Sequence, residues 1–236
     1  MVGIHHAKTY FAINVNKYFK PLINNLEDIL NTIAGLEARF NLPLPGWPAQ
    51  EKMIGRVRPM PAAIPANARP SAVLCLLFPV GGVLHILLMK RKEDNSAHSG
   101  QVSFPGGGVE PSDADYKATA LREAQEEVGI MAADVTIIGP LTSLYIPVSN
   151  FNVYPYLGFT AQRPVYNLSH HEVSYILEIP VVALFHESRK TKAEVTSPAM
   201  PGIKMNVNAY QLEDNTIIWG ATAMILSEIE AIIGPL

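Results

Sequence analysis

Apolar residues recur with two different periods along this chain, and together the periods predict an α+β protein. From Tyr18 to Phe40 they recur every three or four positions, which predicts an amphipathic helix that breaks or tilts near Gly35. From residue 71 onward, short apolar runs predict strands, and the turn signal Pro79-Val-Gly-Gly82 joins the first two. The predicted strands are Ser71–Phe78, Val83–Lys90, Gln101–Phe104, Val135–Ile146, Val153–Thr160, Ile176–Leu184, Ile203–Tyr210 and Thr216–Trp219. Helices are expected at Asp115–Val128 and Ala221–Ile232, so strands flank a central helix as in an α+β sandwich.

The chain before residue 71 differs in composition from the rest, mainly in its proline content. The stretch Asn41–Pro70 holds seven of the 19 prolines, which lack a backbone donor, so it is expected to be an extended connector. We therefore expect an N-terminal amphipathic helix and proline-rich connector over residues 1–70, and one domain over residues 71–236. Because an amphipathic helix buries its apolar face, this one is expected to pack on that domain or on a second subunit of a homodimer.

Composition and charge exclude several classes of protein. Charged residues make up 17% of the chain and the net charge is −3, so the basic stripe of a nucleic-acid-binding protein is not expected. The single cysteine, Cys75, can form no internal disulfide and is expected to be a small core residue. No apolar run approaches the ~20 residues of a membrane span, and no basic-then-apolar signal pattern begins the chain. These features favour a soluble cytoplasmic protein without a membrane partner.

The expected helix over Asp115–Val128 concentrates acidic residues on one side. On a helical wheel the apolar side holds Leu121, Ala124 and Val128, and the acidic side holds Glu123, Glu126 and Glu127, with Arg122 at its edge. Such a face is often only a solvated surface. Here, however, Glu123 and Glu127 are like charges at i and i+4, and the acids lie in the C-terminal half, which the helix dipole disfavours. A divalent cation such as Mg²⁺ removes both objections, because it binds carboxylates together with substrate phosphates.

Three glycines, Gly106-Gly107-Gly108, precede this helix by a short loop. Glycine allows a close backbone approach, so the loop can present carbonyls to a metal or amides to a phosphate. The loop matches neither the P-loop nor the dinucleotide-binding fingerprint.

These residues together resemble the signature of the Nudix hydrolases. In that family a glycine is followed after five residues by an acid, and after seven more by Arg-Glu-apolar-x-Glu-Glu-x-Gly-apolar. The run Arg122-Glu-Ala-Gln-Glu-Glu-Val-Gly-Ile130 matches every fixed position, and Gly107 with Asp113 matches the front half. The spacing departs from the pattern, because eight residues rather than seven separate Asp113 from Arg122. Asp113 is therefore either a metal ligand or a cap of the helix.

A second stretch is similar to the motif that precedes this signature in the coenzyme A pyrophosphatases of the family. That group has Leu-Leu-Thr-x-Arg-Ser and then His-x-Gly-x-Val-x-Phe-Pro-Gly-Gly. This chain has Leu87-Leu-Met-Lys-Arg91 and His98-Ser-Gly-Gln-Val-Ser-Phe-Pro-Gly-Gly107, with departures at Met89, Lys92 and Asn95-Ser96. The extra residue in the signature and the ending Ile218-Trp-Gly-Ala-Thr-Ala223 are also similar to this group.

The resemblance implies a Nudix α/β/α sandwich with a mixed sheet over residues 71–236, plus an N-terminal helical extension. It also implies an Mg²⁺ or Mn²⁺ cofactor held by Glu123, Glu126, Glu127 and the backbone of Gly107, with Arg122 orienting the carboxylates. Glu172 is our candidate for general base or additional metal ligand, against the alternative of a surface charge. Glu178 and Glu187 are weaker candidates for that role.

Four residues of the two motifs are candidates for binding the substrate: Arg91, His98, Gly106 and Gly107. The alternatives are that Arg91 pairs with a nearby acid and that His98 is structural. Phe104 and Trp219 are expected in the core rather than against a ligand.

The activity implied is metal-dependent hydrolysis of a pyrophosphate bond in a small nucleotide-containing substrate. For coenzyme A or acyl-coenzyme A the products are (acyl-)4′-phosphopantetheine and adenosine 3′,5′-bisphosphate. The alternatives are hydrolysis of another nucleoside diphosphate derivative, and a catalytically silent module that binds a nucleotide. Retention of all three helical glutamates favours an enzyme.

Overall fold

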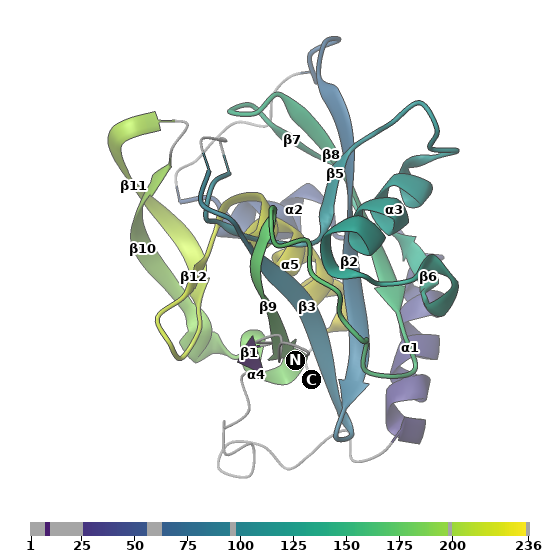
Figure 1. Ribbon diagram of the computed structural model, residues 1–236. Coiled ribbons are helices and arrows are strands. Elements are labelled where there is room, and N and C mark those ends of the chain that lie inside the picture. The colour runs from purple at the N-terminus through teal and green to yellow at the C-terminus, as the bar shows by residue number, and fades with distance from the viewer. Residues whose placement is uncertain (1–7, 10–25, 56–62, 95–97, 198–199, 235–236) are drawn as a thin grey trace, which may run out of the picture.

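Helices cover both faces of a mixed β-sheet in the computed structural model of this protein (Figure 1). The structure describes residues 8–9, 26–55, 63–94, 98–197 and 200–234. Within these residues the main sheet has nine strands, and its central order is β1-β9-β3-β2-β8-β6. The strands are β1 (Lys8–Thr9), β2 (Arg69–Val80), β3 (Val83–Arg91), β4 (Val102–Ser103), β5 (Gly106–Gly108), β6 (Thr136–Pro140), β7 (Leu144–Ile146), β8 (Phe151–Phe159) and β9 (Val173–Pro180).

The two central strands diverge along their length, and the divergence places the glycine loop. β2 and β3 form the antiparallel hairpin that the sequence predicts, with Val80 opposite Val83. Farther from this turn β3 pairs with β4 instead, and β2 pairs with β5. The connection between β4 and β5 crosses from one central strand to the other, and Pro105 O accepts a hydrogen bond from Leu74 N at 2.9 Å. The three glycines therefore form an inner strand of the sheet rather than a free loop.

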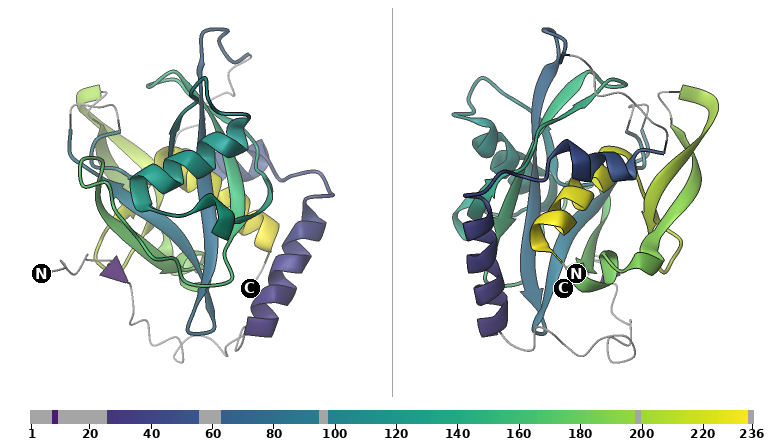
Figure 2. Two further views of the ribbon diagram at one scale, coloured as in Figure 1. Left: turned by 45° about the vertical axis from the view of Figure 1, so that its right-hand side comes forward. Right: turned by 180° about the vertical axis from the view of Figure 1, so that it is seen from behind.

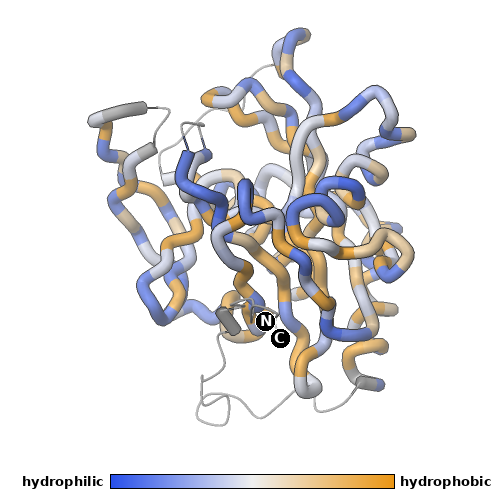
Figure 3. The backbone as a smooth tube through the Cα atoms, in the orientation of Figure 1, coloured by the Kyte–Doolittle hydropathy of each residue, from blue (hydrophilic) through white to orange (hydrophobic). Residues whose placement is uncertain are grey.

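Both faces of the sheet are buried, which explains why β2 reads as an unbroken apolar run. Cys75 and Leu77 belong to a core cluster shared with α1 (Leu26–Arg39) and α5 (Gly220–Ile233). Leu74 and Leu76 belong to a second cluster, shared with α3 (Tyr116–Val128). Figure 2 shows α1 and α5 on the side of the sheet opposite α3. Figure 3 shows apolar residues gathered along the central strands. Cys75 is fully buried, as predicted.

A small second sheet stands beside the main one, at the left of Figure 1. It consists of β10 (Lys190–Ser197), β11 (Met200–Gln211) and β12 (Ile217–Ile218), in that order. The remaining short helices are α2 (Trp47–Gln50), η2 (Glu51–Met53), η3 (Ala132–Asp134), α4 (Val181–Leu184) and η4 (Glu187–Arg189). No helix among the described residues is long and apolar enough to cross a bilayer.

The N-terminal segment departs from its prediction in two ways. Helix α1 begins at Leu26, the expected start at Tyr18 lies outside the described residues, and the helix runs through Gly35 without a break. The stretch after it is not simply an extended connector, because α2 and η2 pack against α5. Gly46 N and Gln50 Nε2 donate hydrogen bonds at 3.2 and 2.9 Å to the fully buried carboxylate of Glu228 on α5. Because Ile29, Ile33 and Leu36 of α1 also join the core cluster of α5, the helix packs on the same domain.

Two predicted strands differ from the observed ones for physical reasons, and one long observed strand was not predicted. The expected strand Val135–Ile146 is split into β6 and β7, because Thr142 N donates to the Glu228 carboxylate rather than to the sheet. The expected strand Ile176–Leu184 ends at Pro180, where α4 begins. Strand β10 was not predicted at all. Its charged residues, Lys190, Lys192 and Glu194, leave it without the apolar run that marks the other strands. The strand is identified only by its pairing with β11, which the local sequence does not reveal.

Candidate active site

Helix α3 is fixed at both ends, and its C-terminal end holds the loop that carries Glu172. The Asp115 side chain caps the start by accepting from Ala118 N at 2.7 Å. Gly129 adopts the left-handed conformation that commonly ends a helix, with φ of 79°. The last carbonyls, of Glu127 and Val128, accept from Ser169 N at 2.9 Å and from Asn167 N at 3.0 Å. The segment leading to Glu172 is therefore docked on the acidic end of α3.

Glu127 is the most deeply buried of the three helical glutamates, with 1% of the residue exposed. Its Oε2 accepts from Gly106 N at 2.8 Å, and its Oε1 accepts from Arg91 Nη1 at 3.2 Å. Burial raises the pKa of Glu127 to about 7, although the Gly106 amide and Arg91 act in the opposite direction. The expected separation of an acidic face from an apolar face is therefore wrong at this residue. Glu127 lies on the buried side of α3 with Ala124 and Val128, and Leu121 is only half-buried.

Glu123 lies directly against the glycine strand. A Cβ added to Gly107 would lie 2.4 Å from Glu123 Oε1, so only glycine permits this contact. Burial raises the pKa of Glu123, Arg122 partly offsets the rise, and the charges of Glu126 and Glu172 add to it. Glu172 also raises the pKa of Glu127. Its own side chain is exposed. The carboxylates of α3 and Glu172 therefore repel one another across one small region.

Arg122 organises the outer part of this acidic cluster. Its guanidinium donates five hydrogen bonds, two to Asp113 at 2.9 and 3.0 Å and one each to Glu123, Glu126 and the carbonyl of Gly108. The hydrogen bonds from Arg122 hold the pKa of Asp113 well below its usual range. The cap of the helix is therefore Asp115 rather than Asp113, and Asp113 shares the Arg122 guanidinium with Glu123 and Glu126.

Three of the four predicted substrate-binding residues, Arg91, Gly106 and Gly107, contact the cluster, and two of these are hydrogen-bonded to Glu127. The amide of Gly106 is taken by Glu127, so it is not available to a phosphate in this conformation. Arg91 uses one N–H on Glu127 and keeps a quarter of its side chain exposed. His98 is half-buried in the turn between β3 and β4, and its Nδ1 lies 3.2 Å from Gln101 Oε1.

The weaker candidates for a base lie in other environments. Glu178 is fully buried and accepts from Arg163 and from the hydroxyl of Tyr166. Glu187 pairs with Lys190 at 2.6 Å. Neither carboxylate is among the groups that shift the pKa of Glu123 or Glu127.

The donor set of the acidic cluster fits a hard divalent cation in its chemistry. Its candidate ligands are carboxylate oxygens, and a cation would offset both the burial and the mutual repulsion that raise the pKa of Glu123 and Glu127. Glu123 Oε2 accepts no hydrogen bond from the described residues. Among those residues, however, no three acidic, histidine or cysteine side chains already surround one point. In this conformation the arginines occupy oxygens that a metal would use.

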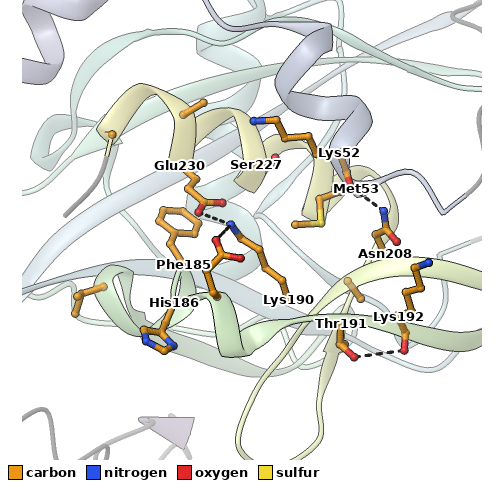
Figure 4. Close-up of a pocket in the computed structure, with 15 residues that line it drawn as sticks. Lys52, Met53, Phe185, His186, Lys190, Thr191, Lys192, Asn208, Ser227 and Glu230 are labelled. Atoms are coloured by element: carbon orange, nitrogen blue, oxygen red, sulfur yellow. Dashed lines mark hydrogen bonds and ion pairs between the residues drawn. The ribbon is translucent and has the colours of Figure 1, made fainter. Parts of the chain in front are cut away.

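A cavity of about 880 Å³ lies apart from this cluster, between α5, β10 and β11 (Figure 4). Three charged residues of its lining, Lys190, Glu187 and Glu230, pair with one another. Lys190 Nζ bridges Glu187 and Glu230 at 2.6 and 2.8 Å, and the Tyr210 hydroxyl donates to Glu230 at 3.0 Å. None of the α3 carboxylates lines the cavity. The chemistry of α3 therefore does not extend into it.

Comparisons with known proteins place the same residues within one matched domain. The NUDIX domain matches residues 68–196, more than half of the chain. An uncharacterised Nudix hydrolase, NudL, from Yersinia enterocolitica is 33% identical over 176 residues, which cover 73% of this chain and 85% of the relative. NudL of Klebsiella pneumoniae is 34% identical over 180 residues, covering 75% and 90%. A MutT/nudix family protein from Enterococcus faecalis aligns with a TM-score of 0.48 and 15% identity, over 75% of this chain and 65% of that structure. The matched domain contains every site residue described above.

Proposed function

This chain belongs to the Nudix family of hydrolases, and we propose that it cleaves the pyrophosphate bond of coenzyme A or acyl-coenzyme A. The observation that carries the proposal is the acidic cluster itself. Glu123 and Glu127 meet the glycine strand, and Arg122 holds Glu123 and Glu126. Such a concentration of partly buried negative charge is unfavourable for folding, so it calls for a functional reason.

Glu123, Glu126, Glu127 and the carbonyl of Gly107 are the residues that would hold Mg²⁺ or Mn²⁺. When bound, such an ion neutralises the charge of the diphosphate and lowers the pKa of a water molecule. Arg122 keeps the carboxylates in place through charge-assisted hydrogen bonds, which are stronger than neutral ones.

Glu172 is the proposed general base. It is exposed, its side chain makes no hydrogen bond or ion pair with the described residues, and its charge raises the pKa of both Glu123 and Glu127. The oxygen of water forms a bond to one phosphorus, the bridging P–O bond breaks, and Glu172 accepts the proton of the water. The leaving phosphate keeps the bridging oxygen.

Arg91 and His98 are proposed to bind the substrate. Arg91 has N–H groups beyond the one bonded to Glu127, and a guanidinium fork matches phosphate oxygens. In this arrangement one arginine contacts both the buried carboxylate and the diphosphate. The amide of Gly106, by contrast, is proposed to position Glu127 rather than to bind substrate.

The choice of coenzyme A rests on the motif from Leu87 to Gly107, which is similar to that of coenzyme A pyrophosphatases. The test is to incubate the pure protein with coenzyme A, ADP-ribose and dinucleotides in Mg²⁺ or Mn²⁺ and to identify the products. We expect 4′-phosphopantetheine and adenosine 3′,5′-bisphosphate from coenzyme A, and no products in excess EDTA. Turnover of ADP-ribose alone would assign another diphosphate substrate, and binding without any turnover would indicate a silent module.

Glu172→Gln tests the proposed base, with Glu187→Gln as the matched control. Loss of a general base lowers kcat on the order of a hundredfold or more. We expect that loss in Glu172→Gln with little change in KM. Glu187 is a surface residue away from the acidic cluster, so its variant should keep wild-type kcat. An unchanged kcat in Glu172→Gln would remove Glu172 from the mechanism.

A further inference from the structure

Several separate parts of the chain line the cavity between α5, β10 and β11. Its volume of about 880 Å³ lies within the range of small-molecule pockets, roughly 300–1,000 Å³. Besides these three elements, η2 and the segment around α4 contribute to its wall. Of the lining elements, η2, β11 and α5 lie outside residues 68–196, the part that matches the NUDIX domain. The cavity is therefore formed where that domain meets the segments before and after it.

One part of the cavity wall is apolar and fixed in place. Met53 and Ala209 are buried, and Phe185 packs against the core cluster of α5 while remaining half-buried. The Phe185 ring lies 6.1 Å from that of Tyr210, centre to centre. Val182 and Ala231 complete this part of the lining. A ligand with an apolar body would gain free energy here, because both surfaces leave water on binding.

Two of the three lysines that line the cavity have no acidic partner. Lys190 is paired, since its Nζ bridges Glu187 and Glu230. The side chains of Lys52 and Lys192 make no hydrogen bond or ion pair with the described residues. Figure 4 shows Lys52 on η2 and Lys192 on β10, so they reach the cavity from different elements. Three lysines and two glutamates leave the lining with a net positive charge.

We infer that this cavity is a binding site for a small amphipathic organic anion, with its apolar body against Phe185 and Met53 and its acidic group near Lys52 and Lys192. Both parts of the wall are needed to complement such a molecule. An inorganic anion would leave the apolar part uncovered, and a neutral apolar molecule would leave the two lysine charges without a partner. None of the α3 carboxylates lines the cavity, so the inference does not rest on the proposed hydrolase activity.

Two related dyes serve as probes for the full-length protein. The first, 8-anilinonaphthalene-1-sulfonate, joins an apolar ring system to one acidic group, and its fluorescence rises when it leaves water. The second, N-phenyl-1-naphthylamine, has the same rings without the sulfonate. We expect saturable binding of the sulfonate dye at a single site and weaker binding of the neutral dye. Added salt should weaken only the binding of the sulfonate dye, because ions screen exposed charges.

Substitutions within the lining test the two parts of the wall separately. Lys52→Gln and Lys192→Gln should each weaken the sulfonate dye about threefold, and together about tenfold, with no change for the neutral dye. The matched control is Lys204→Gln, because Lys204 pairs with Glu194 on the same hairpin outside the lining, and it should behave as wild type. Ala231→Phe places a ring in the cavity and should weaken both dyes at least about tenfold. Thermal melts show whether each variant is folded, which matters because partly folded chains also bind such dyes.

Three results would overturn the proposal: no saturable binding of the sulfonate dye to the wild type, equal affinity of the wild type and the double lysine variant for it, or its displacement by methylenediphosphonate with Mg²⁺. The last result would place the dye at the acidic cluster of α3. If Ala231→Phe does not fold, the lysine variants still decide the outcome, because exposed lysines can be replaced with little effect on stability. Turnover of coenzyme A is not part of this test, so the hydrolase proposal can fail while the binding site stands.

Discussion

Replacing Glu127 with glutamine distinguishes the effect of the buried charge on folding stability from its effect on catalysis. The variant keeps the size of the side chain and removes its charge. An amide oxygen can still accept from Gly106 N, and Arg91 remains partly hydrated because a quarter of its side chain is exposed. We therefore expect the metal-free variant to be more stable than wild type at neutral pH while losing its activity.

The magnitude follows from the pKa of Glu127, which is 4.5 for an ordinary glutamate and about 7 in the folded protein. Below pH 4.5 the carboxyl is protonated in both the folded and the unfolded chain. Between 4.5 and 7 the folded protein holds a proton that the unfolded chain releases, so the free energy of unfolding falls as pH rises. At about 1.4 kcal/mol for each pKa unit, the free energy of unfolding is lower by roughly 3 kcal/mol above pH 7 than below pH 4.5. Because this pKa already includes the opposing effect of Arg91, we expect the variant to gain roughly 3 kcal/mol relative to wild type above pH 7.

The assay is urea unfolding in EDTA at pH 5 and pH 8, together with kcat in Mg²⁺. Wild type should lose stability between the two pH values and Glu127→Gln should lose less. Glu126→Gln is the control for stability, because the Glu126 side chain is 57% exposed and should leave the wild-type pH dependence intact. We expect kcat of Glu127→Gln to fall on the order of a hundredfold, as for loss of one electrostatic stabiliser. The reasoning would be refuted if the free energy of unfolding changed equally with pH in wild type and in Glu127→Gln. An unchanged kcat in Glu127→Gln would also refute it.

Three further predictions concern the packing around the site and the anchor of the N-terminal segment. Gly107→Ala should lower kcat/KM at least about tenfold, because its Cβ would lie 2.4 Å from Glu123 Oε1. Gly35→Ala is the matched control with unchanged activity, since its Cβ would meet no atom within 4 Å. Glu228→Ala should lower the free energy of unfolding in urea by about 3 kcal/mol, because the buried donors of Gly46, Gln50 and Thr142 lose their acceptor. A decrease below about 1 kcal/mol would contradict this prediction. Leu121→Ala should lower the free energy of unfolding by less than about 2 kcal/mol in thermal melts, because Leu121 is only half-buried. A loss above about 3 kcal/mol, as for a fully buried leucine, would contradict its observed position.

The sequence alone determined the elements whose signals are local. The helix over Asp115–Val128, the hairpin at Pro79–Gly82 and the final helix are all confirmed, with α3 beginning one residue after its Asp115 cap. The family was also readable from the sequence, because the signature places its residues within one helix and the loop before it. These features depend on neighbours a few positions apart, which a periodic pattern reports directly.

Only the tertiary structure decided how the site residues are used. Glu127 looks like a surface acid on a helical wheel, yet its partners are Gly106 and Arg91, which lie 21 and 36 positions away in the chain. The Glu228 anchor joins residues up to 182 positions apart, and it accounts for the break between β6 and β7. Periodicity gives the face on which a residue lies relative to its own element. Burial, charge and pKa depend on the residues that pack against that face from elsewhere in the chain. For Glu127 these residues are Arg91 and Gly106, which lie on the two diverging sides of the sheet beneath α3.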